Sequence, residues 1–453
     1  MVRVLLLIAV VALGASDAAA HGRDPIALHI EFRHDHPQDV LAGTTIGLLT
    51  SHDGGATWRW TCEEAVHYQD PFDPDYAYAA DGTIFAQTFT GLGIDRQTCG
   101  FSPTNLGKLV ISSVTTTGTG VVYAASSDAT DHSIYKSIDN GVSFAPVSAP
   151  GQLGDWWRSL EVAKSDSERV YLTGYRFIGT TKQFLFFVSR DGGATFDPID
   201  TASFATTDSS MIDVVHIGAN PDLVYARVTF SREPDNGDVI YRSTDAGATW
   251  GKLFTNGDPY GVSFLARSTG ELVVATRLSG AWHSFDDGAT WQPLPNPPHI
   301  SSLVETPSGD VWAGTQNYLG IQPGGRPPIP SDGYAIMKSS DLVTWTPVMR
   351  MQDLAGVACR EGTDVFVQCA GTDRGLGTAW CCLVSTLGIT ASEIDCSGPR
   401  SCGAVAGDIT VPPPDGCCQS GSQPSLLVVL LLCGYAYRPR RAACLRARGH
   451  RSR

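Results

Sequence analysis

Basic residues are scarce in this sequence. The chain has 453 residues and carries 32 Lys and Arg against 46 Asp and Glu, a formal net charge of −14. Nucleic-acid binding needs a basic footprint, so this composition argues against nucleic acid as a partner. Charged residues make up only 17% of the chain, and no helical period competes with short apolar runs. The 48 Gly and 27 Pro instead suit many short strands joined by turns.

Metal-binding patterns are absent as well. The sequence has no EF-hand spacing and no His-rich motif, and no Cys-x-x-Cys pair lies in its Cys-rich segment. The run from Asp70 to Asp75 clusters three carboxylates that could bind calcium, but Asp-Pro turns are common and we interpret it as a structural loop. We expect neither a metal nor a cofactor.

The first twenty residues are typical of a secretory signal peptide. Arg3 precedes an apolar run from Val4 to Leu13, and the stretch 18–20 supplies an Ala-x-Ala cleavage site. We therefore expect residues 1–20 to be removed and the protein to be exported. No Cys follows the apolar run, which argues against an N-terminal lipid anchor.

Cysteines in an exported chain are expected to be mostly oxidised. Six of the 12 lie close together near the end of the globular part, namely Cys359, Cys369, Cys381, Cys382, Cys396 and Cys402. Six cysteines allow fifteen pairings, so their connectivity stays open. We name one bridge as a guess, Cys62–Cys99.

An octapeptide with the pattern Ser-x-Asp-x-Gly-x-Thr/Ser-aromatic recurs along the chain. Its aspartates are Asp53, Asp139, Asp191, Asp245 and Asp286, and Asp341 belongs to a copy one residue shorter. An Asp two residues before a Gly favours a tight turn, because its carboxylate can accept backbone N–H bonds. The Gly supplies a positive φ, and the closing Thr-aromatic pair starts a strand. Each octapeptide therefore predicts a hairpin turn.

The octapeptide resembles the Asp box, or BNR repeat, of sialidases, sortilin-type receptors, xyloglucanases and photosystem-assembly-factor-like proteins. All of these carry it on β-propellers, so the resemblance implies that fold. The families share almost no chemistry, so the repeat does not imply an activity. In them the boxes lie on the outer rim, away from the active site, and we interpret the six aspartates as structural.

The spacing of the octapeptides predicts the number of blades. Successive aspartates lie 86, 52, 54, 41 and 55 residues apart, and a degenerate copy at 93–99 fills the long first gap. The stretch 384–390 looks like one more copy without its Asp. Residues 21–398 are thus predicted to form an all-β propeller of seven to eight four-stranded blades. The count favours eight, although seven is common among related propellers.

Strand alternation predicts which face binds a ligand. If the octapeptides join the third and fourth strands of each blade, the long loops 317–333 and 231–238 lie on the opposite face. The connectors 68–76 and 151–157 lie there too. Long loops on a rigid scaffold tend to carry function.

Residues on the innermost strands are the candidates for chemistry. Glu31, Glu161, Asp213 and Glu305 could supply two opposed carboxylates for glycoside hydrolysis. Inner strands of any propeller tolerate polar residues, however, so their presence does not require an activity. Trp156 and Trp157 could stack on sugar rings, but packing explains them without a ligand.

A resemblance to sialidases would require specific residues, and the sequence can be checked for them. The N-terminal Arg-Ile-Pro motif is missing, because Arg33 is followed by His34 and Asp35. No spacing selects three arginines that could clasp a carboxylate. A xyloglucanase-like hydrolase is therefore the better enzymatic alternative.

The last residues form a three-part tail. A Pro/Gly-rich stalk over 399–416 precedes Cys417 and Cys418, and an apolar run over 426–437 is followed by seven arginines. The tail, 417–453, resembles the MYXO-CTERM sorting signal of proteins displayed at the myxobacterial surface. Arginines resist crossing the bilayer, so the short apolar run is expected to hold the chain at the membrane. The resemblance implies cleavage near Cys417 by a sortase-like membrane protease, with the exposed Cys available for a lipid anchor.

Together these patterns predict an exported, monomeric β-propeller anchored through its C-terminus at the cell surface or outer membrane. We expect it to act as a binding or display module for a glycan or protein ligand that the sequence does not identify. The alternative is a glycan-directed hydrolase.

Overall fold

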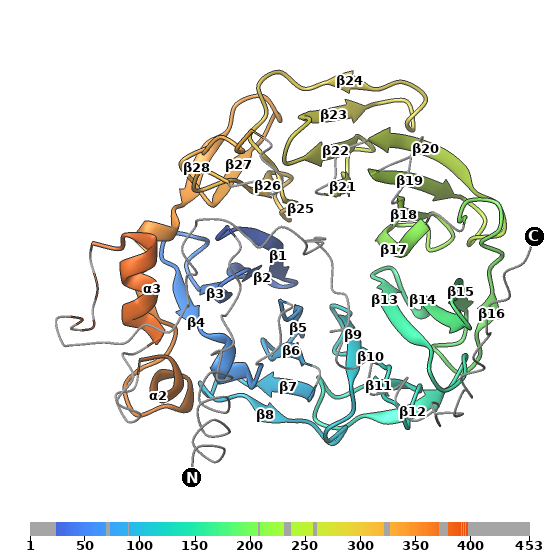
Figure 1. Ribbon diagram of the computed structural model, residues 1–453, viewed down its shortest axis with the longest axis horizontal. Helices are drawn as coiled ribbons and strands as arrows, with labels where there is room; N and C mark the ends of the chain where they lie inside the picture. The colour runs from blue at the N-terminus through green and yellow to red at the C-terminus, as the bar shows by residue number, and fades with distance from the viewer. Residues whose placement is uncertain are drawn as a thin grey trace, which may run out of the picture.

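Seven β-sheets arranged around an axis make up a β-propeller in the computed structural model (Figure 1). The structure describes residues 24–396 except 69–72, 89, 207–208, 231–236, 257–260, 321–326, 371–378, 391, 393 and 395. Each blade consists of four antiparallel strands that are consecutive in the chain. The signal peptide, the stalk and the tail, with Cys417 and Cys418, lie outside the described residues.

The strands follow one another from the axis outward in every blade. Blade 1 comprises β1 (Ala27–Arg33), β2 (His36–Thr44), β3 (Gly47–Ser51) and β4 (Arg59–Thr61); blade 2 comprises β5 (Tyr76–Tyr78), β6 (Ile84–Thr88), β7 (Gly91–Asp95) and β8 (Ser102–Pro103); blade 3 comprises β9 (Ile111–Thr116), β10 (Val122–Ser126), β11 (Ile134–Ser137) and β12 (Ala145–Ser148). Blade 4 comprises β13 (Trp156–Ala163), β14 (Asp166–Ile178), β15 (Thr181–Ser189) and β16 (Asp197–Pro198); blade 5 comprises β17 (Ser209–Ile217), β18 (Val224–Phe230), β19 (Gly237–Ser243) and β20 (Gly251–Asn256). Blade 6 comprises β21 (Val262–Ala266), β22 (Leu272–Thr276), β23 (Ala281–Ser284) and β24 (Gln292–Pro293); blade 7 comprises β25 (Ser302–Glu305), β26 (Val311–Gly314), β27 (Ile336–Ser339) and β28 (Thr346–Met349).

Second strands are apolar on both faces because a neighbouring blade covers each face. All five residues of β10 and all five of β22 are buried. Such strands read as continuous apolar runs instead of an alternating pattern. The hydrophobic core is correspondingly divided into layers between blades; one layer packs Tyr171 and Phe186 of blade 4 against Val228 and Val239 of blade 5.

Each octapeptide forms the turn between the third and fourth strands of its blade, as predicted. In blade 4, Ser189 Oγ donates to Asp191 Oδ1 (2.8 Å) and accepts the N–H of Gly193 (2.8 Å). Asp191 then accepts the Thr195 N–H (2.8 Å) and hydroxyl (2.6 Å). One carboxylate therefore organises the whole turn. The degenerate copy in blade 2 retains part of this pattern, because Asp95 accepts the Thr98 N–H (2.8 Å).

Acid should weaken these turns. Hydrogen bonds from Ser137 and Ser143 lower the pKa of Asp139 to about 2, and those from Thr290 and Ser284 lower the pKa of Asp286 to about 2. A depressed carboxyl pKa gives stability that is present above the unfolded value and lost as pH falls through the folded value. We expect the melting temperature to drop between pH 4 and pH 2. Scanning calorimetry should show a smaller drop for Asp286→Asn than for wild type.

Asp287→Asn is the matched control for this prediction. Asp287 lies in the same turn, but its contact is a surface ion pair with Arg242 (3.6 Å), a kind that contributes little to stability. The variant should keep the wild-type pH profile. Equal profiles for all three proteins would contradict the role assigned to the turn carboxylates.

The prediction of an eighth blade is wrong. Most of the stretch 384–390, interpreted as an octapeptide that had lost its Asp, belongs to the helix α3 (Ala379–Leu387). A second helix, α2 (Asp364–Ala370), precedes it, and both lie outside blade 1 (Figure 1). Without an Asp the stretch lacks the carboxylate that organises the turn, and Trp380, Leu383 and Leu387 of helix α3 are buried.

The guessed disulfide Cys62–Cys99 is also wrong. Cys62 is bonded to Cys369 and Cys99 to Cys359, so both bridges join early blades to the C-terminal segment. A third bridge, Cys381–Cys396, lies within that segment, and Cys382 is also disulfide-bonded.

Residues after blade 7 close the ring. The segment passes through a 3-10 helix, η3 (Met351–Asp353), into β29 (Gly356–Val357), which pairs in parallel with β4 at the outer edge of blade 1. Helix α2 packs against the 3-10 helix η1 (Glu63–Val66) that follows β4. We call residues 350–396 the clasp. Because each blade is built from consecutive strands, the clasp takes the place of a strand exchanged between the last blade and the first.

Candidate functional site

The inner edge of the ring is a belt of side-chain to main-chain hydrogen bonds. Each of the seven blade junctions has one such bond on or beside its innermost strand. They join Glu31 Oε2 to Tyr78 N (3.1 Å), Tyr78 O to Thr116 Oγ1 (2.6 Å), Ser113 Oγ to Leu160 N (3.0 Å), Ser159 Oγ to Val214 N (3.0 Å), Asp238 Oδ2 to Val262 N (2.8 Å), Ser263 Oγ to Ser301 O (2.8 Å) and Ser301 Oγ to Ala27 O (2.7 Å). Polar residues are therefore needed there to hold the blades together. Glu31, one of the candidate catalytic acids, accepts one of these bonds, from the Tyr78 N–H.

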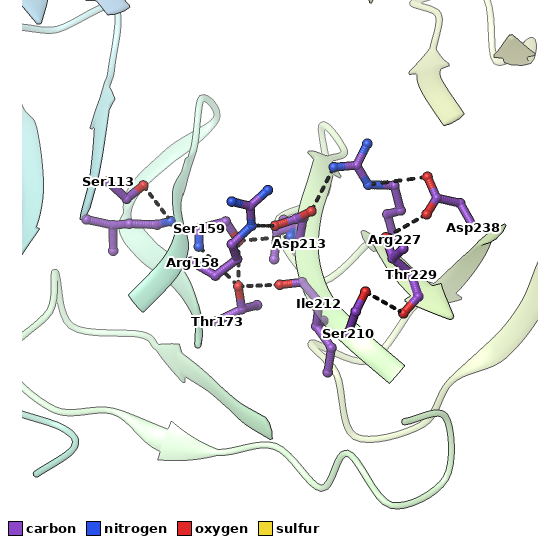
Figure 2. Close-up of polar contacts among 12 residues, drawn as sticks. Ser113, Arg158, Ser159, Thr173, Ser210, Ile212, Asp213, Arg227, Thr229 and Asp238 are labelled. Carbon is purple, nitrogen blue, oxygen red and sulfur yellow. Dashed lines mark hydrogen bonds and ion pairs between the residues drawn. The ribbon is translucent and has the colours of Figure 1, made fainter. Parts of the chain in front are cut away.

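Asp213 is held between two arginines at the junction of blades 4 and 5 (Figure 2). Its Oδ1 accepts from Arg158 Nε (2.7 Å) and its Oδ2 from Arg227 Nη2 (2.7 Å). The residue is 7% exposed. Burial alone would raise the pKa of Asp213, but the charges of the two guanidinium groups lower it. Asp213 is thus an ionised carboxylate that is already paired, which suits a structural role.

Glu305 is engaged in a similar way. It accepts from Arg267 Nε (3.3 Å) and from the Ser268 N–H (2.7 Å), which ties blade 7 to blade 6. Arg267 also bonds to Glu271 (2.7 Å), and Glu271 contacts His283 (2.8 Å). The carboxylate of Glu305 therefore belongs to an ion-pair network.

Glu161 differs from the other three acids. Its one recorded hydrogen bond is long, from Thr115 Oγ1 (3.5 Å), and within the described residues it has no ion pair. The side chain is half-buried. Burial raises the pKa of Glu161 to about 7, against the opposing effect of Lys164 and His29. His29 itself contacts Glu31 (3.6 Å). Glu161 is the inner-edge carboxyl group that is available for proton transfer or ligand contact at neutral pH.

The raised pKa of Glu161 predicts a pH dependence of stability. Because the folded value lies above the unfolded value of about 4.3, the stabilisation is present at low pH and is lost as pH rises through about 7. We expect the free energy of unfolding to fall by on the order of 2 kcal/mol between pH 5 and pH 8 from this group. Glu161→Gln, which stays neutral, should flatten that profile in urea titrations.

Thr115→Val serves as the control, since it removes the long hydrogen bond and leaves the carboxyl group. Its pH profile should keep the wild-type slope. A Glu161→Gln protein whose stability changes with pH as steeply as that of wild type would disprove the assignment.

The two adjacent tryptophans at the start of β13 have different environments. Trp157 is 0% exposed, donates its indole N–H to His132 O (3.2 Å) and meets the Phe187 ring edge-on (6.1 Å). It is a core residue, so sugar stacking by Trp157 is excluded. Trp156 is half-buried and lies opposite Tyr175 on β14. Only Trp156 of the pair could contact a ligand.

The loop 317–333 lies on the face predicted from strand alternation, but its ends are built into the fold. Asn317 is 3% exposed and accepts the Met351 N–H through Oδ1 (3.0 Å). Tyr318 donates to Leu387 O (2.8 Å) in helix α3. The loop therefore braces the clasp, a role that its Pro/Gly-rich sequence did not indicate.

Exposed apolar side chains are unevenly distributed. Among the large ones in the described part of the chain, Ile138, Val142, Phe285 and Val343 belong to the octapeptide turns, and Val367 lies in helix α2. The others are Leu28, Leu153, Phe177, Ile178, Leu278 and Leu319. These six lie at the start of a first strand, in a connector between blades, at the end of a second strand, or between second and third strands. All six are therefore on the face opposite the turns, which we call the loop face.

Neither a metal centre nor a membrane span is found in the part of the chain that the structure describes. No three His, Cys, Asp or Glu side chains there are grouped so that they could hold a metal ion. No helix there is long and apolar enough to cross a membrane. Asp70, one of the calcium candidates, lies outside the described residues.

Comparison with known proteins gives structural likenesses alone. No protein-family model and no curated protein matches the chain. It is similar to an ancestral GH74 enzyme, with 16% identity over 69% of this chain and 47% of that one and a TM-score of 0.48. It is also similar to a GH74 enzyme of Niastella koreensis, with 14% identity over 73% of this chain and 55% of that one and a TM-score of 0.47. A third similar structure is YCF48 bound to D1 peptide, with 16% identity over 64% of this chain and 90% of that one and a TM-score of 0.42. The chain spans about half the length of the two GH74 enzymes.

Proposed function

We propose that the protein is an exported propeller, displayed at the cell surface, that binds an extracellular ligand through its loop face. The observation that carries this proposal is that six of the eleven large exposed apolar side chains among the described residues lie on that face, and that two of them, Phe177 and Ile178, are adjacent at the end of β14. Exposed apolar residues that gather on one side mark interaction sites more often than scattered ones do. The octapeptides, interpreted as Asp boxes, then serve the scaffold.

The condition of the inner-edge acids favours binding over hydrolysis. A glycosidase needs two opposed carboxyl groups that are free to act on the bond. Asp213 and Glu305 are paired with arginines, and Glu31 holds the main chain of the next blade. Only Glu161 lacks such a partner among the described acids considered for this role.

Paired substitutions on the two faces test the proposal. The full chain would be screened on a glycan array and against a displayed peptide library. We expect Leu153→Asp with Leu278→Asp to lower binding of the selected ligand at least tenfold. The matched control, Ile138→Asp with Phe285→Asp on the turn face, should bind as wild type does. Loss of binding in the control alone would place the ligand on the turn face and overturn the proposal.

A glycan-directed hydrolase is the second candidate, and the state of Glu161 is the observation that favours it. A carboxyl group with a pKa of about 7 suits a general acid. The purified chain would be assayed on β-glucan and xyloglucan oligosaccharides. Glu161→Gln should then abolish hydrolysis with a wild-type fold. A complete absence of turnover by wild type would exclude this candidate.

Surface display is proposed from the tail alone. Cys417 and Cys418, the apolar run and the arginines fit cleavage and anchoring of the exported chain. Intact-mass analysis of protein extracted from the cell surface tests this. Protein that still carries Arg438–Arg453 would contradict cleavage.

A further inference from the structure

The third strand of blade 4 has an outer edge that is only half covered. Strand β15 runs from Thr181 to Ser189, but its outer neighbour β16 pairs with only two of its residues, Phe187 and Val188. One more backbone bond, from Ile199 N to Phe186 O (2.8 Å), ends the contact. The five residues from Thr181 to Leu185 extend beyond it towards the loop face.

The other six blades show that this overhang is specific to blade 4. In each of them the outer strand reaches the first or second residue of the third strand. The last contacts pair Leu48 with Thr61, Leu92 with Thr104, Ile134 with Ser148, Asp238 with Asn256, Ala281 with Leu294 and Ile336 with Met349. Blade 5 is the nearest comparison, because its second and third strands are also long and its outer strand β20 pairs with the third strand β19 as far as Asp238.

Backbone groups on the overhang face outward without partners. In an antiparallel strand the N–H and C=O of one residue point to the same side, and successive residues alternate. Because Phe186 O accepts from Ile199 on the outer side, the N–H and C=O of Phe184 and Lys182 point outward too. No described residue bonds to these four groups on that side. Gln183 between them and Thr181 before them are exposed.

The overhang also lacks the usual protection of a strand edge. Native edges are often blocked by a lysine side chain. Lys182 does not act in this way, because its ammonium group donates to Ser210 O in blade 5 (2.8 Å) and lies over the Tyr175 ring (4.4 Å). At the tip of the same hairpin, Phe177 and Ile178 are 57% and 63% exposed. Unpaired backbone and apolar side chains thus lie together.

We propose that this edge of β15 docks an extended peptide segment of a partner protein, which adds a strand above β16 and completes blade 4. An added strand gains main-chain hydrogen bonds from Lys182 and Phe184, and its large side chains reach across β15 towards Phe177 or Ile178 at the end of β14. Four to five residues, about 15 Å of extended chain, fill the overhang. The inference rests on the proposed function, because it names the chemical class of ligand bound by the loop face.

The test separates the backbone of Lys182 from its side chain. Random dodecapeptides displayed on phage would be selected on the full chain, and a fluorescent synthetic copy of the recovered peptide serves as the probe. Lys182→Pro removes the outward N–H and should weaken probe binding at least tenfold. Lys182→Ala removes the same side chain but keeps the N–H, so it should bind within about threefold of wild type.

Hydrogen exchange gives a second measurement, which does not depend on how Lys182→Pro folds. In wild type the amides of Lys182 and Phe184 should exchange rapidly and become protected by the probe. A probe that binds Lys182→Pro as well as wild type, or that protects neither amide, overturns the inference. If the Leu153→Asp/Leu278→Asp variant nevertheless no longer binds that probe, the proposed function stands without the inference about the β15 edge. A wild-type dimer that Lys182→Pro dissociates would show that the edge pairs with a second copy, which also overturns the inference.

Discussion

Removal of the two long-range disulfides is expected to open the propeller between blades 7 and 1. Cys62–Cys369 and Cys99–Cys359 close loops of 307 and 260 residues. By the chain-entropy estimate, bridges over loops this long contribute on the order of 5 kcal/mol each. Changing both cysteines of either pair to Ala should lower the free energy of unfolding accordingly, as measured by urea titration under oxidising conditions.

The reason for so large an effect is the way the ring is closed. Blade 1 and blade 7 share no sheet, and the parallel pairing of β29 with β4 spans only two residues on each strand. The remaining described bonds at this junction are few and include those of Ser301 and Ser302 to Ala27 O (2.7 and 3.1 Å). Without the bridges, the clasp has lost its covalent hold on blades 1 and 2.

The third bridge supplies the control. Cys381–Cys396 closes a loop of 15 residues inside the clasp and does not join it to a blade. Its double Ala variant should lose about 3 kcal/mol, with no faster hydrogen exchange at Ala27 in β1. The Cys62/Cys369 variant should show that faster exchange. Equal exchange at Ala27 in both variants would contradict closure by the clasp.

Local patterns were enough to predict the blades but not their closure. The Ser-Asp-Gly-Thr turn is set by bonds within one octapeptide, as at Asp191, so the sequence predicts it directly. The pairing of Cys62 with Cys369 depends on which segments meet after folding, and spacing carries no signal for that. The same limit explains the false eighth blade, because apolar spacing alone did not separate helix α3 from a degenerate repeat.

The strand positions of the four candidate acids could be predicted from the sequence, but their partners could not. Glu31, Glu161, Asp213 and Glu305 all lie on innermost strands, as expected. Their partners come from other strands, so the sequence could not show which acids were already paired. Nor could it show the overhang of β15, since the run 184–188 is as apolar as any buried strand. An uncovered edge is defined by the short length of its neighbour.

Asp213→Ala is expected to be among the most destabilising single substitutions on the inner edge. It removes the bonds to Arg158 Nε and Arg227 Nη2, and it leaves Arg227 with the longer contact to Asp238 (3.8 Å). Removing one partner of a buried ion pair costs about 3–5 kcal/mol, because a charge is left without compensation. Urea titration at pH 7 measures this loss against wild type.

A second substitution shows whether uncompensated charge is the cause. Adding Arg227→Met to Asp213→Ala removes the guanidinium group that the single variant leaves with the longer contact to Asp238 (3.8 Å), so the double variant should be more stable than the single one, even though it lacks more hydrogen bonds. The charged form of Asp213 is the stabilising one, since its folded pKa is depressed. The difference between wild type and Asp213→Ala should therefore shrink as pH falls below about 4. If the double variant is instead less stable than Asp213→Ala at pH 7, the arginine contributes through packing, and the ionic account of this junction fails.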